Sequence, residues 1–166
     1  AIPDIIKKIL RPKLSKVEIF DNEKIFENLM LGDWFYFPAI KWRTETIKNI
    51  AFSGEFHTAM DLDILIRLLE KDQKIAFVKT KTLSYRRHNK SASSQYAKST
   101  GRFDEEFICH ENALKIAQHK NWQKAAWRAK IAPTIRLHAI FQALTIFFSS
   151  PLTAIKIFLK AFSKIG

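Results

Sequence analysis

Two aspartates separated by one residue, Asp61 and Asp63, stand at the start of a segment that is otherwise rich in leucine and isoleucine. The spacing of the apolar residues predicts a helix that begins near Asp61 and runs to Lys71. At about 100° per residue, Asp63 shares with Arg67 the stripe that we expect to face solvent, where an i, i+4 ion pair explains both residues. Asp61 falls in the first turn, on the side of the leucines that we expect to face the core.

A carboxylate at the position of Asp61 could act in two ways. As an N-cap it would accept hydrogen bonds from backbone N–H groups, which stabilises a helix by about 1 kcal/mol. Directed into a cleft, it could act as a general base for a hydroxyl group, and the helix N-terminus would keep it ionised. Asp61 and Asp63 also spell the Asp-x-Asp pattern of a metal site, but they point to opposite sides of the predicted helix. We therefore do not expect them to share a metal ion.

A second cluster of chemically capable residues lies between residues 84 and 94, which read Ser-Tyr-Arg-Arg-His-Asn-Lys-Ser-Ala-Ser-Ser. Arg86 and Arg87 could bind phosphate oxygens in bidentate fashion, and His88 could ligate a divalent metal ion held by a diphosphate. An exposed strand end followed by a serine-capped helix explains the same residues without any ligand. The residues alone leave both interpretations open.

The elements that would position these groups mix helices with short strands. Up to residue 90 the sequence predicts a helix over residues 22–32, a strand over 34–42, a short helix over 44–50, the helix that begins at Asp61, and strands over 74–78 and 82–85. Pro38 would confine the first strand to a sheet edge or a bulge, because proline has no N–H to donate.

Residues 91–166 read as helix almost throughout. We expect helices over 102–120 and 122–149, with a break at Pro133, and a last helix that begins with Pro151. On this last helix one face is basic, with Lys156, Lys160 and Lys164, and the other is apolar, with Leu152, Ile155, Phe158, Leu159 and Phe162. Such a pattern is typical of a helix that lies on a membrane surface, and also of a helix packed on its own domain.

The composition is that of a globular chain with a strong basic bias. The 166 residues are 47% hydrophobic and 27% charged, with a formal net charge of +12. A charge of this sign attracts nucleic acid, anionic lipid head groups or phosphorylated substrates. Cys109 is the one cysteine, which excludes a disulfide within the chain and suits a reducing cytoplasm. The zinc and dinucleotide motifs CxxC, HExxH and GxGxxG do not occur.

Four segments of the chain together resemble, in order and spacing, the C-terminal half of bacterial family-two glycosyltransferases of the GT-A type. They are Phe37-Pro-Ala-Ile-Lys-Trp-Arg-Thr-Glu45, Met60-Asp-Leu-Asp-Ile-Leu-Ile-Arg-Leu68, Lys74-Ile-Ala-Phe-Val78 and Tyr85-Arg-Arg-His-Asn-Lys-Ser91. The match covers about residues 22–95. Many members of the family have an acidic residue immediately before the catalytic base, and this chain has Met60 at the corresponding position. The family's nucleotide-binding strands and its metal-binding Asp-x-Asp are not in these 166 residues, so we expect a part of a longer enzyme or a remnant.

The resemblance implies a mixed α/β but helix-rich fold. Residues 1–95 would be a partial GT-A glycosyltransferase domain, and residues 96–166 an amphipathic helical tail. The implied activity is that of an inverting hexosyltransferase, which moves a sugar from a nucleotide-sugar donor to a hydroxyl of a saccharide or lipid-linked acceptor. This reaction would serve the synthesis of cell-surface polysaccharide or glycolipid.

By the same resemblance, Asp61 is the general base. His88, Arg86 and Arg87 would lie near the donor diphosphate, with His88 as a ligand of Mg²⁺ or Mn²⁺. Four further residues would border the acceptor pocket: Trp42, Arg43, His57 and Thr58. We expect a cytoplasmic protein that is peripheral on the inner face of the cell membrane.

Two other function classes remain open at this stage. A basic helical module that binds nucleic acid would account for the net charge and the tryptophans, although the sequence contains no recognition motif for nucleic acid. A non-catalytic remnant attached to a membrane surface would account for the last helix without any enzymatic activity.

Overall fold

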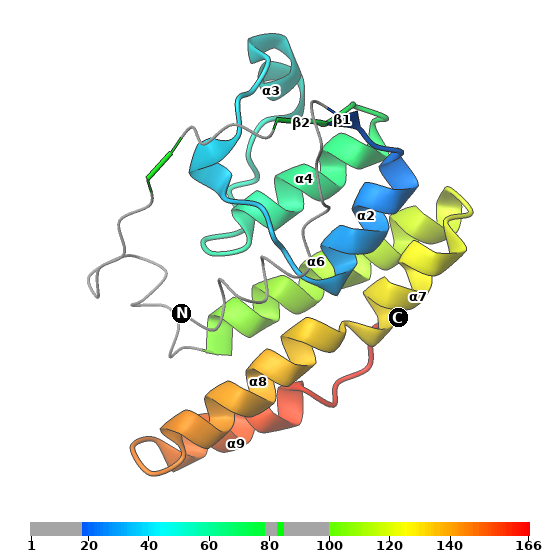
Figure 1. Cartoon of the computed structure of the whole chain (residues 1–166). Helices are drawn as coiled ribbons and strands as arrows, with labels where there is room; N and C mark the ends of the chain where they lie inside the picture. The colour runs from blue at the N-terminus through cyan, green and yellow to red at the C-terminus, as the bar shows by residue number, and fades with distance from the viewer. Residues whose placement is uncertain (1–17, 79–82, 85–99) are drawn as a thin grey trace.

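Helical segments form the framework of the fold in a computed structural model of the chain, which describes residues 18–78, 83–84 and 100–166 (Figure 1). The helices are α2 (Asn22–Leu31), α3 (Thr44–Ile50), α4 (Met60–Glu70), α6 (Thr100–His119), α7 (Gln123–Ile131), α8 (Pro133–Ile146) and α9 (Pro151–Lys160). Two short strands, β1 (Glu18–Ile19) and β2 (Ala76–Phe77), pair antiparallel, with Glu18 opposite Phe77. Among the described residues the fold is therefore helix-rich, as predicted, with no sheet larger than this pair.

The core lies where α2 packs against α7 and α4 packs against α6. Phe26 and Leu29 of α2, Leu65 and Leu69 of α4, and Phe103 of α6 are almost completely buried in it. An ion pair of 2.8 Å between Glu27 and Arg128 adds a polar contact between α2 and α7. The core is continuous from α2 to the end of the chain, and the predicted boundary between residues 95 and 96 lies outside the described residues.

The prediction of a strand over residues 34–42 is wrong. Residues Phe37–Ala39 form a short 3₁₀ helix, η1, with Pro38 in its first turn, where the missing N–H costs nothing. Trp34 and Phe35 are buried and stack on each other with ring centroids 4.2 Å apart, and both contact Phe77 of β2. The aromatic residues thus fill the core from an irregular segment.

Of the two other predicted strands, one is confirmed in part and the other falls partly outside the described residues. The strand over residues 74–78 is confirmed at its centre, as β2. Of the strand over 82–85, residues 82 and 85 lie outside the described residues, and residues 83–84 have no regular structure.

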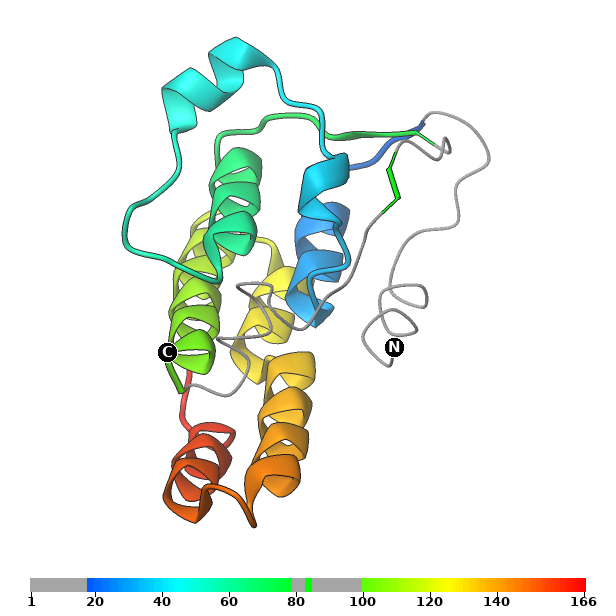
Figure 2. The ribbon, with the colours of Figure 1, turned by 90° about the vertical axis from the view of Figure 1, so that its left-hand side faces the viewer.

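The predicted helices of the tail are confirmed, including the break at Pro133. Ala132 takes a left-handed conformation, with φ 45°, which ends α7 and turns the chain into α8. The Thr134 hydroxyl donates to the Leu31 carbonyl and so fastens the start of α8 to α2. From there α8 and α9 form an antiparallel hairpin (Figure 2), whose open end is held by a 2.5 Å hydrogen bond from Arg136 Nη1 to the Ala161 carbonyl oxygen.

None of the described helices is long and apolar enough to cross a membrane.

Candidate functional site at the start of α4

The loop that leads into α4 is held by one carboxylate. Glu105, in the second turn of α6, accepts hydrogen bonds from the backbone N–H groups of His57, Thr58 and Ala59 at 2.7–3.1 Å. The Thr58 hydroxyl donates to the same carboxylate at 2.8 Å. Three successive N–H groups thus point at one anion, an arrangement that favours a negative charge. The loop and the first turn of α4 are therefore fixed relative to α6.

The balance of effects on Glu105 keeps it ionised. Partial burial on its own would raise the pKa of this carboxyl group. The hydrogen bonds from Thr58, Ala59 and His57 stabilise the charged form and outweigh burial, so the pKa of Glu105 lies below its ordinary value. Sequence reasoning missed this residue: three successive acids at positions 104–106 were a visible signal, but nothing in their spacing identified a partner 46–48 residues away.

Asp61 lies directly after this clamped loop, in the first turn of α4. The helix begins at Met60 and its cap position is Ala59, so Asp61 is not the N-cap. Its Oδ1 accepts a hydrogen bond of 2.9 Å from the backbone N–H of Leu62. The side chain is half-buried, and is neither sealed among the leucines nor fully open to solvent. A carboxylate that is held here and reached by solvent can accept a proton from a bound hydroxyl group.

Asp63, by contrast, is not on a solvent-facing stripe as predicted. It is only 7% exposed, because the end of α3 covers this side of α4. Arg67 Nε and Nη2 donate to Asp63 Oδ2 at 2.9 and 2.7 Å, which confirms the predicted i, i+4 pair. The same guanidinium donates to the carbonyl oxygens of Ile50 and Ala51, at 2.7 and 2.9 Å. The pair is therefore a partly buried tie between α3 and α4.

The residues predicted to border an acceptor pocket fall into two groups. His57 is exposed and Thr58 is half-buried, and both precede Asp61 in the clamped loop. Trp42 and Arg43 lie instead just before α3. Trp42 is half-buried in an aromatic cluster with Phe37 and Phe52, at centroid distances of 5.8 and 6.4 Å, and Arg43 is exposed. The structure thus places His57 and Thr58 in the loop directly before Asp61, and packs Trp42 in an aromatic cluster before α3.

The predicted phosphate and metal residues, Arg86, Arg87 and His88, lie outside the described residues. Within residues 18–78, 83–84 and 100–166, no group of three or more His, Cys, Asp or Glu side chains could hold a metal ion. The Mg²⁺ or Mn²⁺ of the predicted donor site therefore stays a prediction.

Cys109 lies behind the clamped loop and is 1% exposed. Its Sγ is 3.9 Å from the Ala59 carbonyl oxygen. Burial raises the pKa of this thiol far above its ordinary value, and the nearby carboxylates of Asp63 and Glu106 raise it further. Because the thiolate is the reactive form, Cys109 is a packing residue and not a nucleophile.

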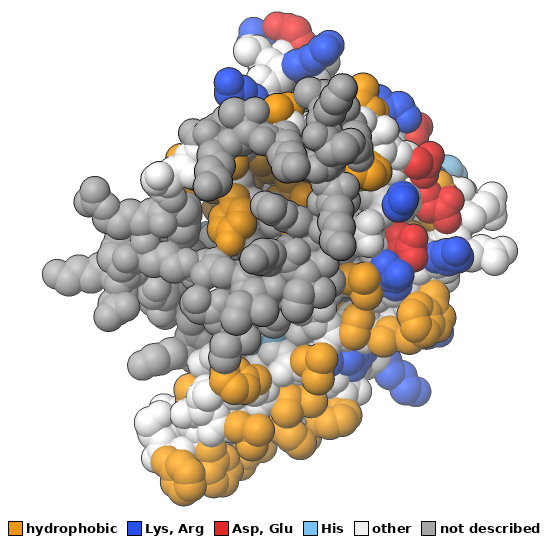
Figure 3. All heavy atoms as spheres, viewed as in Figure 1, with side chains coloured by type: hydrophobic (Ala, Val, Ile, Leu, Met, Phe, Trp, Pro, Cys, Tyr) orange, Lys and Arg blue, Asp and Glu red, His pale blue; other side chains and the backbone are white. Residues whose placement is uncertain are grey.

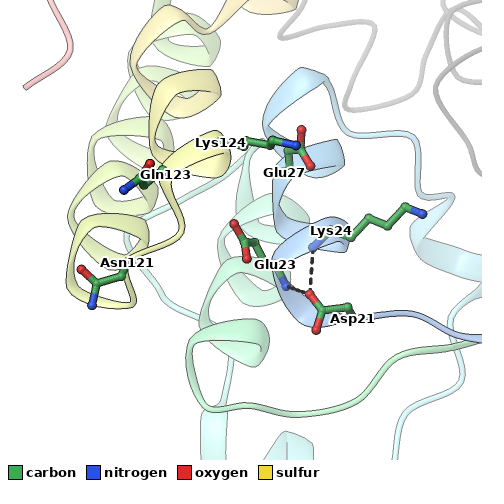
Figure 4. Close-up of a pocket in the computed structure, with 7 residues that line it drawn as sticks. All are labelled: Asp21, Glu23, Lys24, Glu27, Asn121, Gln123 and Lys124. Carbon is green, nitrogen blue, oxygen red and sulfur yellow. Dashed lines mark hydrogen bonds between the residues drawn. The ribbon is translucent and has the colours of Figure 1, made fainter.

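A separate groove of about 530 Å³ lies between the start of α2 and the start of α7 (Figure 4). Four charged residues at the start of α2 line the groove, of which Glu23 points toward α7 and Lys24 away from it, and Lys124 of α7 extends toward Glu27. Asp21 in this groove already caps α2, since its Oδ1 accepts from the N–H groups of Glu23 and Lys24 at 2.9 and 3.3 Å. The mixed charges and the capping role give this groove no catalytic arrangement.

Comparison of the chain with models of protein families, with curated proteins and with solved structures found no match. The functional assignment therefore depends on the residues and their geometry.

Proposed function

We propose that this chain supplies the acceptor side of an inverting sugar transferase, with Asp61 as the general base. The observation that supports it most is the place of Asp61, in the first turn of α4 directly after the loop that Glu105 holds. Asp63 is neutralised by Arg67, and Glu105 is committed to the loop before α4. Asp61 keeps part of its surface open to solvent on a rigidly held first turn. By the resemblance in sequence, Asp61 also corresponds to the base of family-two glycosyltransferases.

In the proposed reaction an acceptor hydroxyl oxygen attacks the anomeric carbon of a nucleotide sugar. The new C–O bond forms as the bond from that carbon to the diphosphate oxygen breaks, and the hydroxyl proton passes to a carboxylate oxygen of Asp61. The nucleoside diphosphate leaves with the electron pair of the broken bond. Glu105 contributes by fixing the loop that precedes Asp61, because a base must be held within hydrogen-bond reach of its proton.

The loop before α4 also gives the acceptor a defined neighbour. His57 is exposed in the loop four residues before Asp61, while the Thr58 hydroxyl already donates its proton to Glu105. His57 can therefore donate to or accept from an acceptor hydroxyl, whereas Thr58 offers only its lone pairs. We include an enclosing role for Trp42 and Arg43, and a donor diphosphate and Mg²⁺ or Mn²⁺ site at Arg86, Arg87 and His88, in the same proposal.

The proposal is tested with Asp61→Asn in the full-length protein that contains this chain. Release of nucleoside diphosphate from a panel of nucleotide sugars is measured with and without saccharide and lipid-linked acceptors. Loss of the base should lower the transfer rate by roughly 10²–10⁴-fold while donor binding, measured by calorimetry, persists. Glu70→Gln is the matched control, since Glu70 is an exposed acid at the far end of α4. A near-normal transfer rate in Asp61→Asn would remove Asp61 from the mechanism.

A further inference from the structure

The two helices of the tail hairpin show an inverted arrangement of small and large side chains. On α8 the residues that face the protein include Ala139 and Ala143, which are at most 4% exposed. The large apolar residues face outward, with exposed fractions of 68% for Leu137, 65% for Leu144 and 97% for Phe148. Phe141, between them, is 53% exposed. Residues 137, 141 and 144 share one side of α8, and Phe148 follows in the turn that leads to α9.

The same inversion occurs on α9. Its inner face consists of Ala154, Ile157 and Ala161, which are buried, and this face packs against α8 and α6. The predicted apolar face therefore points away from the protein, with the exposed residues Leu152, Ile155, Phe158, Leu159 and Phe162. Figure 3 shows hydrophobic side chains gathered along the lower part of the molecule, over α8 and the turn that leads to α9. We call the outward apolar residues of α8, of α9 and of the turn between them the outer face.

The charged residues of α8, of α9 and of the segment after α9 are all Lys or Arg. Residues 112–166 contain nine Lys and Arg and no Asp or Glu, whereas residues 1–111 contain 19 Lys and Arg and 16 Asp and Glu. Lys156 and Lys164 are exposed beside the apolar residues of α9. Lys160 is partly occupied by an ion pair of 2.6 Å with Asp104 of α6. The outer face thus combines a large apolar surface with two exposed lysines, Lys156 and Lys164, and with Lys160, which Asp104 neutralises in part.

We propose that the outer face docks into the surface of a membrane that contains anionic lipids, with α8 and α9 lying in the plane of the bilayer. Apolar side chains would enter the boundary between head groups and acyl chains, and the lysines would remain among the lipid phosphates. α8 has 14 residues and α9 has ten, so they are about 21 and 15 Å long at 1.5 Å per residue. These lengths are too short to span a bilayer and suit an in-plane orientation.

The charge pattern favours lipid over a second copy of the chain as the occupant. A symmetric contact between two outer faces would bring lysines of equal sign together at its rim, and such juxtaposition opposes association. An anionic lipid surface attracts the same lysines and accepts the apolar residues. This inference stands apart from sugar transfer, because it depends on residues 133–166 and on none of the residues near Asp61.

The test is co-sedimentation of the chain with vesicles of phosphatidylcholine, with and without phosphatidylglycerol. The double variant Phe148→Ser, Leu144→Ser, called the serine variant below, loses two exposed apolar side chains. It should lower the partition coefficient of the chain on vesicles at least about tenfold. Lys156→Gln with Lys164→Gln should lower binding to the phosphatidylglycerol vesicles about tenfold and leave binding to pure phosphatidylcholine unchanged. Ile108→Ser is the matched control, an exposed apolar residue of α6 outside the outer face, and it should bind like the parent chain.

Three outcomes would overturn the proposal. One is the absence of binding to either vesicle, and another is equal binding by the parent chain and the serine variant. The third is a concentration-dependent dimer, seen by sedimentation without lipid, that the serine variant abolishes, since a second copy would then cover the face. Salt-sensitive binding to duplex DNA that the serine variant retains would assign the lysines to nucleic acid instead. Unchanged circular dichroism and urea unfolding of each variant separate these outcomes from misfolding.

Discussion

Removing the carboxylate of Glu105 should loosen the start of α4. Four donors end on this group, and hydrogen bonds to a charged partner contribute about 1.5–3 kcal/mol each when their donors cannot find water. His57 is exposed, so water can replace its lost bond, whereas Ala59 is 2% exposed. We therefore expect Glu105→Ala to lower the free energy of unfolding by about 2–4 kcal/mol. Glu105→Gln keeps an acceptor oxygen without the charge, and should cost about 1 kcal/mol.

The effect of Glu105 should also depend on pH in a defined direction. Its pKa is lowered in the folded state by the hydrogen bonds from Thr58, Ala59 and His57, against the opposing effect of burial. A depressed carboxyl pKa contributes stability above the ordinary value of 4.5, and this contribution disappears as the pH falls through the folded-state pKa. The difference in unfolding free energy between the parent chain and Glu105→Gln should be constant from neutral pH to about 5 and should shrink below that.

Two measurements examine this reasoning. Urea unfolding followed by tryptophan fluorescence gives the free energies, and amide hydrogen exchange should become faster at Thr58 and Ala59 in Glu105→Ala. Glu111→Ala is the matched control, since Glu111 is an exposed acid of the same helix, and it should change stability by less than about 0.5 kcal/mol. Equal urea midpoints for Glu105→Ala and Glu111→Ala would show that Glu105 does not stabilise the loop before α4. So would a difference in unfolding free energy between the parent chain and Glu105→Gln that does not shrink in acid.

Two further predictions concern buried groups near the site. Arg67→Met leaves the Asp63 side chain, 9% exposed, without its cation, and should lower the unfolding free energy by about 3 kcal/mol. Adding Asp63→Asn to Arg67→Met should restore part of the lost unfolding free energy. If the effects of the two substitutions in urea unfolding are strictly additive, the Asp63–Arg67 pair does not stabilise the fold as proposed. Cys109 should resist iodoacetamide in the folded chain and react in urea, because burial and nearby carboxylates raise the pKa of its thiol. Labelling of the folded chain at the rate of a small-molecule thiol, measured by mass spectrometry, would contradict this burial.

Local signals in the sequence were sufficient to predict the helices of the tail. Pro133 and Pro151 occupy first helical positions, where a missing N–H and a fixed φ suit the backbone. The break before Pro133 follows from the same property, because proline in a helix interior removes a hydrogen bond. These effects act within one or two turns of the chain, so they can be recognised without knowledge of the tertiary fold.

The strand prediction over residues 34–42 failed because composition reports burial better than backbone conformation. Trp34 and Phe35 are buried, as their size requires, but they pack from a segment without regular structure. Strand propensity reflects the fit of a side chain to a partly buried, pleated surface. Trp34 and Phe35 pack their rings against Phe77 of β2, but β2 pairs with β1, so their aromatic character reflects burial and not strand pairing.

The errors around the site arise from contacts that are distant in sequence. The helical projection correctly placed Asp63 and Arg67 together, but it treated α4 as if nothing covered their side of the helix. The end of α3 does so, through the carbonyl groups of Ile50 and Ala51. Glu105 was missed for the same reason, since its partners lie 46–48 residues away. The candidate base Asp61 was found because a resemblance over several segments pointed to it.

On α9 the sequence predicted which residues form the apolar face and left the direction of that face open. Helical spacing groups Leu152, Ile155 and Phe158 on one side of the helix, but it does not say which side the protein occupies. The structure uses a third side for packing, with Ala154 and Ala161, because small residues let helices approach closely. A face of alanines is easily overlooked beside a face of leucine and phenylalanine.

The alanine-lined packing of α8 and α9 separates two properties that most amphipathic helices couple. The residues that hold the hairpin together, such as Ala139, Ala143 and Ala154, are distinct from those that it presents outward. Exchanges at the most exposed of the outward residues, Leu152 and Phe148, therefore carry little penalty in folding free energy, since these side chains are 77% and 97% exposed. Substitutions at these positions can consequently change the binding affinity of the outer face one residue at a time, while the packing of α8 against α9 stays the same.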